Sequence, residues 1–425
     1  MSADETLAGP LMPIEQTCPS RRAHSPQPSA ERRYGPALMR TISPVNFVSI
    51  ALLAQLVWGC APRSAEGAPE APPQPPAGPS LARRYESLFP IGAAVDPTSR
   101  QTHAPLLEQH FNSVTAENEM KFESIEPREG VFDYKEADAL VAYARAHGMR
   151  VRGHTFVWHR QTPDWVFQDA SGAPASRELL LSRLKNHIDN VATHFKGSVY
   201  AWDVVNEAIM DDGKYRTNDE SEADQRSRWH AILGTDYIAR AFEYAHAADP
   251  DAKLFYNDYR NYIPAKRQAI YQMLKELLAR GVPIHGVGLQ CHLNIEPSTD
   301  PNNHGIYQTI PELEATIELY ASLGLDVQVT ELDLSLYVPG VKYTPDQFYT
   351  VETFTPELAQ KQAERYGAFF DLFRKHAKVI TGVTFWGIAD DNTWLSEFSS
   401  GRKDFPLLFD VNHQPKPAFE RVITF

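Results

Sequence analysis

Cysteine is scarce in this chain, which has only Cys18, Cys60 and Cys291 among its 425 residues. Three thiols so widely separated do not make a disulfide framework, and no Cys-x-x-Cys pair suited to structural zinc occurs. The sequence therefore predicts no metal site. We interpret Cys291 as a small buried thiol without a catalytic role.

Concentrated positive charge is also missing. The chain carries 41 basic and 54 acidic residues, a formal net charge of -13, and its basic residues form no stripe interleaved with aromatic ones. A polyanionic partner such as a nucleic acid is therefore not expected, whereas a neutral polymer raises no conflict of charge. With 43% hydrophobic residues, the chain can form a large core.

Three common enzyme signatures are absent. The chain contains no GxSxG nucleophile elbow, no HExxH helix and no glycine-rich phosphate loop. These absences argue against a serine hydrolase, a zinc protease and a nucleotide-dependent enzyme. We expect chemistry that needs no cofactor.

A hydrophobic run long enough to cross a bilayer is missing from the first eighty residues. Their one apolar stretch, Phe47 to Val57, is about eleven residues long, which suits the apolar centre of a signal peptide. Arg40 precedes it and Cys60 ends it, so residues 39–60 resemble a bacterial lipoprotein signal whose cysteine becomes lipidated. Trp58 is bulkier than is usual there, so ordinary secretion and a merely buried or disordered run are the alternatives.

The chain is predicted to have four parts. Residues 1–38 are an extension upstream of the true start or a disordered leader, and residues 39–60 are the signal peptide. Residues 61–82, rich in proline and alanine, form an extended linker, and residues 83–425 form one catalytic domain. We expect a monomer that is secreted, or anchored through Cys60 to the bacterial outer membrane or cell surface.

From Tyr85 onward, short β-branched or aromatic runs alternate with helical patterns of period near 3.6, in eight such units. Eight units predict an α/β fold, the (β/α)8 TIM barrel. The clearest helices are followed by a glycine, as expected at a helix C-terminus, and these glycines are Gly148, Gly281 and Gly324. The strands are predicted near Ile91, Val114, Val151, Val199, Leu254, Val287, Val327 and Val383.

In such a barrel, the carboxyl ends of all strands meet at one rim, where the loops build the active site. Seven of the predicted strands end in polar or aromatic side chains. They are Glu117, Asn118 and Lys121; His154 and Trp158; Asn206 and Glu207; Asn257, Asp258 and Tyr259; Gln290 and His292; Glu331 and Asp333; and Trp386. A polar loop explains one such strand end, but seven in succession predict a single cleft.

Two glutamates indicate the chemistry of this cleft. Glu207 in YAWDVVNEA and Glu331 in DVQVTELDL each stand where a buried apolar run gives way to polar residues. Cleavage of a glycosidic bond needs one carboxyl with a raised pKa to donate a proton and one carboxylate to attack or stabilise the sugar. A lone glutamate at a strand end is usually an ion-pair partner, but the polar rim around this pair favours a glycosidase.

The other rim residues suit a sugar. Amide, imidazole and ammonium groups bind hydroxyls, and indole rings pack against the apolar faces of sugars. We predict that Lys121 donates to a hydroxyl, and that Trp158, Trp386 and Trp394 are candidates for contacts with sugar rings. Any single tryptophan here could equally belong to the core.

Eight segments resemble glycoside hydrolase family ten, the retaining endo-1,4-β-xylanases. They are VTAENEMKFESIEP, RGHTFVWH, WDVVNEA, LFYNDY, GVGLQCHL, VQVTELDL, VTFWGI and GRKDFPLLFDVNHQPKPAF. The resemblance covers residues 83–425 in order, and it does not depend on any one short motif. It implies xylan and xylo-oligosaccharides as the substrates.

The resemblance also implies a role for each matching residue. Glu207 matches the family's general acid/base and Glu331 its nucleophile, and Asn206 would hydrogen-bond the 2-hydroxyl of the sugar at the cleavage point. Tyr259 is a weaker match on the leaving-group side. The residues that match the sugar sites on the non-reducing side are Glu117, Asn118, Lys121, His154, Trp158 and Gln290, with Trp386 and Trp394 as their floor and cover.

The implied mechanism is double displacement with retention of configuration. His292 and Asp333 match a supporting pair that keeps the nucleophile Glu331 oriented and ionised. The charge on Glu331 should keep Glu207 protonated until the leaving group departs, and loss of that charge in the glycosyl-enzyme should let Glu207 ionise and act as base.

Two loops depart from the family pattern. Residues 211–229 and 337–354 are longer than expected and belong to the leaving-group side. The length of the product and the tolerance of decorated xylan are therefore left open.

Two other functions remain as alternatives to endo-hydrolysis of β-1,4-xylosidic bonds. A related retaining β-1,4-glucanase or mannanase would use the same two glutamates. A non-catalytic carbohydrate-binding lipoprotein could be built on an inactive barrel, although the presence of both Glu207 and Glu331 argues against it.

Overall fold

The computed structural model describes residues 78–399 and 401–425. The predicted leader, the signal peptide with Cys60, and the linker up to residue 77 lie outside these residues. The first described helix, α1 (Leu81–Arg84), follows Ser80, whose side chain accepts a hydrogen bond from the backbone nitrogen of Arg83 at 3.3 Å. Leu81 is fully buried, so the folded domain includes residues that were predicted to be linker.

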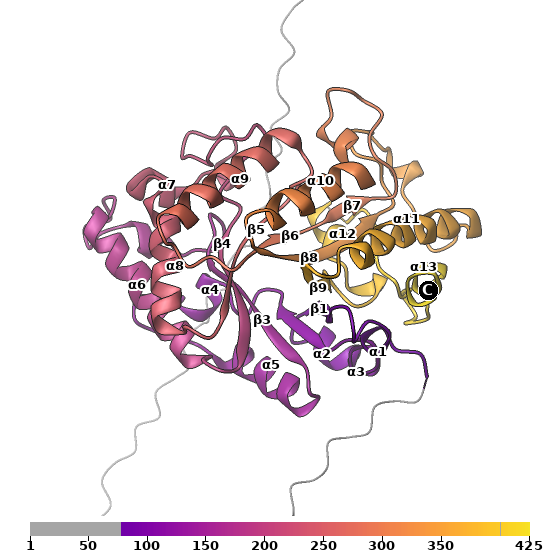
Figure 1. Cartoon of the computed structure of the whole chain (residues 1–425), viewed down its shortest axis with the longest axis horizontal. Coiled ribbons are helices and arrows are strands. Elements are labelled where there is room, and N and C mark those ends of the chain that lie inside the picture. The colour runs from indigo at the N-terminus through magenta and orange to yellow at the C-terminus, as the bar shows by residue number, and fades with distance from the viewer. Residues whose placement is uncertain (1–77, 400) are drawn as a thin grey trace, which may run out of the picture. The chain divides into compact units, whose positions relative to one another are not determined.

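Eight parallel strands form a closed barrel (Figure 1), which confirms the predicted fold. They pair in the order β6–β5–β4–β3–β2–β1–β9–β8, and pairing between β6 and β8 closes the ring. The strands are buried along most of their length, which explains their apolar runs. They are β1 (Ile91–Val95), β2 (Ser113–Ala116), β3 (Arg150–Val157), β4 (Val199–Asn206), β5 (Lys253–Asp258), β6 (Gly286–Leu289), β8 (Asp326–Ser335) and β9 (Ile380–Phe385).

Helices lie outside the strands and surround the barrel (Figure 1). The longer ones are α5 (Lys135–Ala146), α6 (Arg177–His194), α8 (Asp236–Ala248), α9 (Pro264–Ala279), α10 (Ile310–Ala321) and α11 (Pro356–Lys375). The shorter ones are α2 (Ser99–Thr102), α3 (Ala104–His110), α4 (Phe122–Ile125), α7 (Arg228–Leu233), α12 (Trp394–Phe398) and α13 (Pro417–Ile423). Gly148, Gly281 and Gly324 follow α5, α9 and α10 with φ of 66°, 79° and 77°, so the three predicted helix ends are confirmed.

A close contact between β3 and β4 requires glycine at position 153. A Cβ atom on Gly153 would lie 2.1 Å from the ring of Trp202. That ring is buried and stacks on Phe156, with ring centroids 4.2 Å apart. The indole therefore fills the space that a side chain on residue 153 would need.

The sixth predicted strand is broken in two. β6 ends at Leu289, and a short strand, β7 (His292–Asn294), follows after two residues. The break falls at Cys291, whose φ of 58° is a left-handed conformation that bends the chain. Both pieces pair in parallel with β8.

A charge pair lies buried inside the barrel. Arg152 donates to both carboxylate oxygens of Asp203, to one of them at 2.6 Å, and to Oε1 of Gln328 at 2.9 Å. Asp203 also contacts Nδ1 of His154 at 2.9 Å. Because these groups satisfy one another, the charges are tolerated in the interior.

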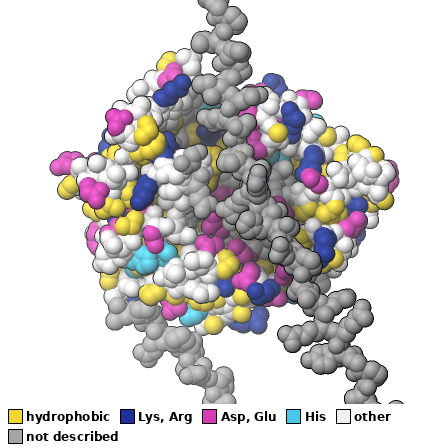
Figure 2. Space-filling view, turned by 180° about the vertical axis from the view of Figure 1, so that it is seen from behind, with side chains coloured by type: hydrophobic (Ala, Val, Ile, Leu, Met, Phe, Trp, Pro, Cys, Tyr) yellow, Lys and Arg dark blue, Asp and Glu magenta, His cyan; other side chains and the backbone are white. Residues whose placement is uncertain are grey.

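Charges of both signs are mixed on the surface. On the face that Figure 2 shows, basic side chains are scattered among acidic ones. None of the helices in the described part of the chain has both the length and the apolarity to cross a membrane.

Candidate active site

Glu207 and Glu331 are held by β4 and β8. Glu207 follows β4 directly with φ of 60°, and its backbone nitrogen donates to the carbonyl oxygen of Asn257 at 2.9 Å. Glu331 lies within β8, and 5% of its surface is exposed. Its backbone nitrogen donates to the carbonyl oxygen of Gln290 at 3.0 Å. The two carboxyl groups are connected through side chains that include those of Asn257 and Gln290.

Each carboxylate oxygen of Glu331 has its own partner. Nδ2 of Asn257 lies 2.8 Å from Oε1, and Nε2 of His292 lies 3.1 Å from Oε2. The other ring nitrogen of His292 contacts Asp333 at 2.9 Å, and the indole nitrogen of Trp394 donates to the same oxygen of Asp333 at 2.8 Å. This arrangement fixes the orientation of Glu331.

The imidazole between these carboxylates is positively charged at neutral pH. Burial alone would lower the pKa of His292, but the charge of Asp333 and hydrogen bonds to Asp333 and Glu331 raise it to about 10. A charged donor forms a stronger hydrogen bond with a carboxylate than a neutral one. His292 and Asp333 therefore lie beside Glu331 as expected, and their supporting role stays a prediction.

Glu207 accepts two hydrogen bonds from side chains. The indole nitrogen of Trp158 lies 2.8 Å from Oε2, and Nε2 of Gln290 lies 2.9 Å from Oε1. Both donors were predicted to bind sugar. In the structure, both donate to Glu207, so they orient this carboxyl group in the absence of a sugar.

Asn206 connects the two carboxyl groups. Its Oδ1 accepts from Asn257 at 3.0 Å and from Gln290 at 3.2 Å, and its Nδ2 lies 3.4 Å from Oε1 of Glu207. Because Asn257 and Gln290 each donate from the same amide nitrogen to a carboxylate, their amide orientations are fixed. If the side-chain amide of Asn206 were turned over, its nitrogen would face two other hydrogen-bond donors, the side-chain nitrogens of Asn257 and Gln290. The amide nitrogen of Asn206 therefore points toward Glu207.

The pKa of Glu207 differs from the expectation. Burial raises it, but the charge of His159, the hydrogen bonds from Gln290 and Trp158, and the charge of Arg216 lower it to about 2. The sequence predicted a raised pKa, so that expectation is wrong for the substrate-free site. The physical reason is the number of donors around this carboxylate.

His159 affects Glu207 only while the imidazole is charged. Its Nδ1 lies 3.9 Å from Oε2 of Glu207. Burial lowers the pKa of His159 to about 3, so the ring is neutral at neutral pH. The causes that remain to lower the pKa of Glu207 at neutral pH are the hydrogen bonds from Gln290 and Trp158 and the charge of Arg216.

Lys121 belongs to a polar cluster at the ends of β2 and β3. Its Nζ donates to Asn118 at 3.0 Å and to Gln161 at 2.8 Å, and lies 4.9 Å from the centroid of Trp158. Burial outweighs the nearby glutamates and lowers the pKa of Lys121. Glu117 follows β2, and its charge acts on Lys121. Asn118, Lys121 and Trp158 of the predicted set thus lie together, with Gln161 as an additional member.

Two tryptophans flank the histidine beside the nucleophile. The ring centroid of His292 lies 4.8 Å from that of Trp394 and 6.4 Å from that of Trp386. Trp386 also contacts His154 edge to face at 5.5 Å. Trp386 is buried, whereas Trp394 is half-buried. The predicted floor, Trp386, therefore contacts both His154 and His292, and the predicted cover, Trp394, contacts His292.

Tyr259, the weaker match, reaches Glu207 through an arginine. Arg216 donates to the hydroxyl of Tyr259 at 3.0 Å and to the carbonyl oxygen of Glu207 at 2.9 Å. Arg216 comes from the long loop 211–229, which also helps to line a cavity of about 480 Å³ beside His159. The loop that departs from the family pattern is therefore part of this side of the site.

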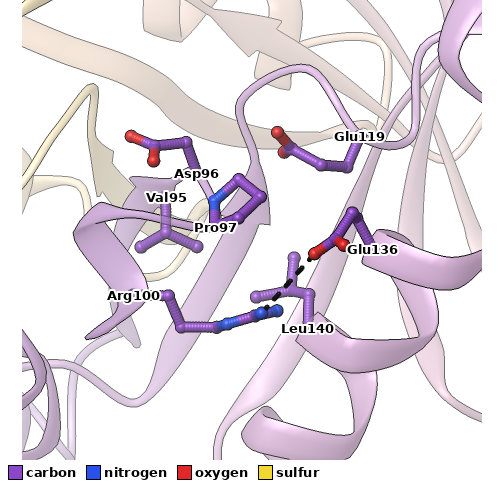
Figure 3. A pocket seen from close by; sticks show the side chains of 7 residues that line it. All are labelled: Val95, Asp96, Pro97, Arg100, Glu119, Glu136 and Leu140. Carbon is purple, nitrogen blue, oxygen red and sulfur yellow. Dashed lines mark ion pairs between the residues drawn. The ribbon is translucent and has the colours of Figure 1, made fainter.

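The depression in Figure 3 is not a second site. It lies between β1, α2 and α5, where Arg100 extends toward Glu136 with a nitrogen–oxygen distance of 3.8 Å. Its interior volume is close to zero, which is too small for a water molecule.

Sequence reasoning missed several residues of the site. Asn257 was placed at the rim without a role, and Gln161, His159 and Arg216 were not singled out. Gln161 and His159 follow directly after β3, so their proximity to Trp158 was the available signal. Arg216 lies inside a loop, where no pattern predicts its direction. Cys291 is buried and burial raises the pKa of its thiol, so the expectation of an unreactive thiol agrees with the structure.

Comparison with known proteins places this site in a family. The chain is 48% identical over 347 residues to endo-1,4-beta-xylanase B of Paenibacillus barcinonensis, covering 81% of this chain and 98% of that protein. It is 47% identical to an endo-1,4-beta-xylanase of Geobacillus stearothermophilus, with the same coverage of both chains. The crystal structure of a xylanase from Paenibacillus barcinonensis with a conduramine derivative superposes with a TM-score of 0.73, at 46% identity, covering 82% of this chain and 98% of that one.

The family sequence model described as Glycosyl hydrolase family 10 matches residues 80–425, which is the whole barrel and the segments after it. Because this match covers most of the chain, and the relatives are nearly half identical over almost their entire lengths, the chain belongs to glycosyl hydrolase family 10.

Proposed function

We propose that this protein is an endo-1,4-β-xylanase that hydrolyses internal β-1,4-xylosidic bonds of xylan with retention of configuration. Glu331 is the nucleophile and Glu207 is the general acid/base. The family and the names of the relatives support the activity and the substrate. One relative, 44% identical over 353 residues, is named an exoglucanase, so the glucanase alternative has some support, whereas mannanase activity and a non-catalytic binding function have none among the relatives named above.

The observation that carries the proposal is the chain of amides between the two carboxyl groups. Gln290 donates to Glu207 and Asn206, and Asn257 donates to Asn206 and Glu331. Four amide donations thus hold both carboxyl groups in a fixed relation before substrate binds. Such preorganisation is what a two-carboxylate displacement requires.

In the first step, an oxygen of Glu331 attacks the anomeric carbon of the xylose at the cleavage point, and the bond to the leaving oxygen breaks. Glu207 gives its proton to that oxygen. Asn257 and charged His292 hold the attacking carboxylate in place, and Asn206 binds the 2-hydroxyl of the same sugar. Formation of the ester neutralises the charge on Glu331.

In the second step, ionised Glu207 removes a proton from a water molecule, which attacks the anomeric carbon. The bond to Glu331 breaks, and the β-configured product leaves. Two inversions at the same carbon give net retention.

Glu207 must be protonated before the first step, although donors hold its pKa low in the free site. A bound leaving-group sugar would cover the carboxyl group and remove the remaining water, which raises the pKa of a carboxylic acid. We infer that Glu207 takes up its proton when substrate binds. Neutral His159 does not oppose this uptake.

We also propose that the protein is secreted or lipid-anchored through Cys60. The basic and apolar pattern of residues 39–60, followed by a proline-rich segment, supports this proposal. Mass spectrometry of the mature N-terminus, purified from the native host, tests it. A lipid-modified Cys60 at the N-terminus supports anchoring, an unmodified residue near this position supports free secretion, and an intact Met1 contradicts both.

The activity is tested by proton NMR of the full chain acting on xylohexaose, with cellohexaose in parallel. We expect internal cleavage of the xylose oligomer and a new reducing end that is first observed as the β-anomer. A first-formed α-anomer would contradict retention. Cleavage of cellohexaose alone would move the substrate to a β-1,4-glucan, and no cleavage of either oligomer would contradict the enzyme.

A further inference from the structure

Three residues far apart in the sequence meet on the outside of the barrel. His103 precedes α3, Asp391 lies in the 3-10 turn Asp390–Asn392, and His413 lies in a turn before α13. Nε2 of His103 lies 3.0 Å from Oδ1 of Asp391, and Nε2 of His413 lies 3.3 Å from Oδ2 of the same carboxylate. We refer to these three residues as the His–Asp–His cluster.

The spacing in the His–Asp–His cluster fits a tetrahedral ion. All three potential ligand atoms lie within 4.8 Å of one another. Around zinc with bonds of about 2.0–2.1 Å, tetrahedral ligand atoms lie about 3.3 Å apart, which is within that limit. The two rings are tilted by 39° with centroids 4.2 Å apart, and both Nε2 atoms lie next to the same carboxylate.

Thr102 also contacts the ring of His103. Its hydroxyl donates to the carbonyl oxygen of Thr98 at 3.1 Å and lies 2.8 Å from Nδ1 of His103. This contact would orient the ring, as partners of metal-bound histidines do.

A second group of similar composition already has a cationic partner. Glu314, Glu318 and His376 also bring three potential ligands together. There, however, the ammonium group of Lys375 already lies 2.6 Å from Oε1 of Glu314. In the described part of the chain, only the two histidines form ion pairs with Asp391.

We propose that His103, Asp391 and His413 bind one divalent transition-metal ion of the Zn²⁺ type. Two imidazole nitrogens and one carboxylate favour such an ion over Ca²⁺ or Mg²⁺, which prefer oxygen ligands. The ion would join the first βα unit to the loop after β9 and to the C-terminal turn. That loop leads directly into Trp394, whose indole contacts Asp333.

An existing contact already joins two of these segments. Nδ2 of Asn392 donates to Oδ2 of Asp96 at 3.1 Å, and Asp96 belongs to the turn after β1 that Figure 3 shows. The ion would add a second connection between the first and last units of the barrel. No spacing pattern in the sequence predicts the cluster, because 288 residues separate His103 from Asp391.

The test uses the full chain, stripped of metal by a chelator and titrated with zinc sulfate by calorimetry. The variants are His103→Gln, His413→Asn and, as a matched control, His376→Gln in the second group. We expect wild type and His376→Gln to bind one more zinc ion than the other two variants, whose affinity at this site should fall at least about 100-fold. The melting temperature should rise with zinc only in proteins that keep the site.

Cobalt provides an independent readout. The visible absorption of Co²⁺ is much stronger in a tetrahedral site than in octahedral solvation, so wild type should give an intense visible band that His413→Asn lacks. His413 is partly exposed in a turn, so this variant should fold even if the substitution of buried His103 does not. Equal zinc stoichiometry in wild type and His413→Asn, or binding weaker than millimolar in both, would overturn the proposal.

Discussion

The amide nitrogen of Asn257 lies 2.8 Å from Oε1 of Glu331, so one buried amide orients a buried carboxylate. The same nitrogen lies 3.0 Å from Oδ1 of Asn206, and Oδ1 of Asn257 accepts from Thr330 at 2.7 Å. Asn257 therefore forms hydrogen bonds through both the nitrogen and the oxygen of its amide group. It supports the proposed nucleophile.

Replacement of Asn257 by alanine should lower kcat about 100- to 1000-fold with a smaller change in KM. It should also lower the free energy of unfolding by about 1–3 kcal/mol, because Thr330 loses its buried partner. Steady-state kinetics on xylohexaose and urea unfolding measure the two effects. Exposed Asn190, on α6, is the matched control, and its alanine variant should behave as wild type. An unchanged kcat in Asn257→Ala would contradict the role given to this amide.

Removal of each proposed catalytic carboxyl should have different consequences. Glu331→Ala should lower the turnover of every substrate by more than about 10,000-fold, because no covalent intermediate can form. Glu207→Ala should mainly slow substrates with poor leaving groups, since a good leaving group departs without a proton. Xylohexaose and an activated aryl xyloside, compared under single-turnover conditions, distinguish the two. Circular dichroism checks that both variants fold, and an active, folded Glu331→Ala protein would refute the assignment.

The pH dependence of activity should change when Trp158 is replaced and should stay the same when His159 is replaced. The indole of Trp158 stabilises ionised Glu207, so Trp158→Phe should raise the pKa of Glu207. The acid form then persists to higher pH, and the basic limb of kcat, which reports the enzyme–substrate complex, should move to more alkaline values. Because His159 is neutral at neutral pH, His159→Gln should leave this limb in place.

The two variants act as controls for each other in the pH experiment. Measurement of kcat from acid to alkaline pH on one xylo-oligosaccharide suffices. An equal alkaline shift in both variants would mean that His159 carries a charge near Glu207. No shift in Trp158→Phe would mean that its hydrogen bond does not influence the proton of Glu207.

His292 should make stability depend on alkaline pH. Its pKa is raised to about 10 in the folded protein, against about 6.5 for an unperturbed histidine. Its contribution to stability is complete below pH 6.5, or about there, and is lost as the pH rises through about 10. Asp333→Asn removes the strongest raising cause, so the difference in unfolding free energy between wild type and this variant should shrink with rising pH in that interval. Exposed Asp212→Asn should not show this change.

Gly153 should be among the least replaceable residues of the barrel. Alanine there would place a methyl group 2.1 Å from the indole of Trp202, and overpacking of this kind costs about 1–3 kcal/mol or more. Gly172→Ala is the comparison, because it has no atom within 4 Å and only an unfavourable φ of 83°, worth about 1 kcal/mol. Urea unfolding should show the larger loss for Gly153→Ala.

The barrel could be predicted because its strands are buried and because glycine follows three of its helices, α5, α9 and α10. Continuous apolar runs such as that of β4, and stops such as Gly148, each report local conformation. The rim residues followed from topology, since parallel strands carry their carboxyl ends to one side. Glu207, Glu331, Gln290 and His292 needed no further information to be placed there.

Other features depend on contacts that local sequence does not encode. Arg216 belongs to a loop without periodicity, and its direction is set by the carbonyl of Glu207 and the hydroxyl of Tyr259. The pKa of Glu207 was predicted with the wrong sign because it depends on how many donors converge on one carboxylate. Sequence position indicates which groups lie near Glu207, but it does not show how their opposing effects on its pKa add.

The bend at Cys291 affects both of the proposed catalytic carboxyl groups. Gln290 and His292 flank this residue, and they donate respectively to the acid/base Glu207 and to the nucleophile Glu331. A change in the backbone at position 291 would therefore rotate both donors together. Substitutions at Gln290 and His292 should therefore act non-additively. A variant that changes the protonation of one carboxyl group would also change the orientation of the other.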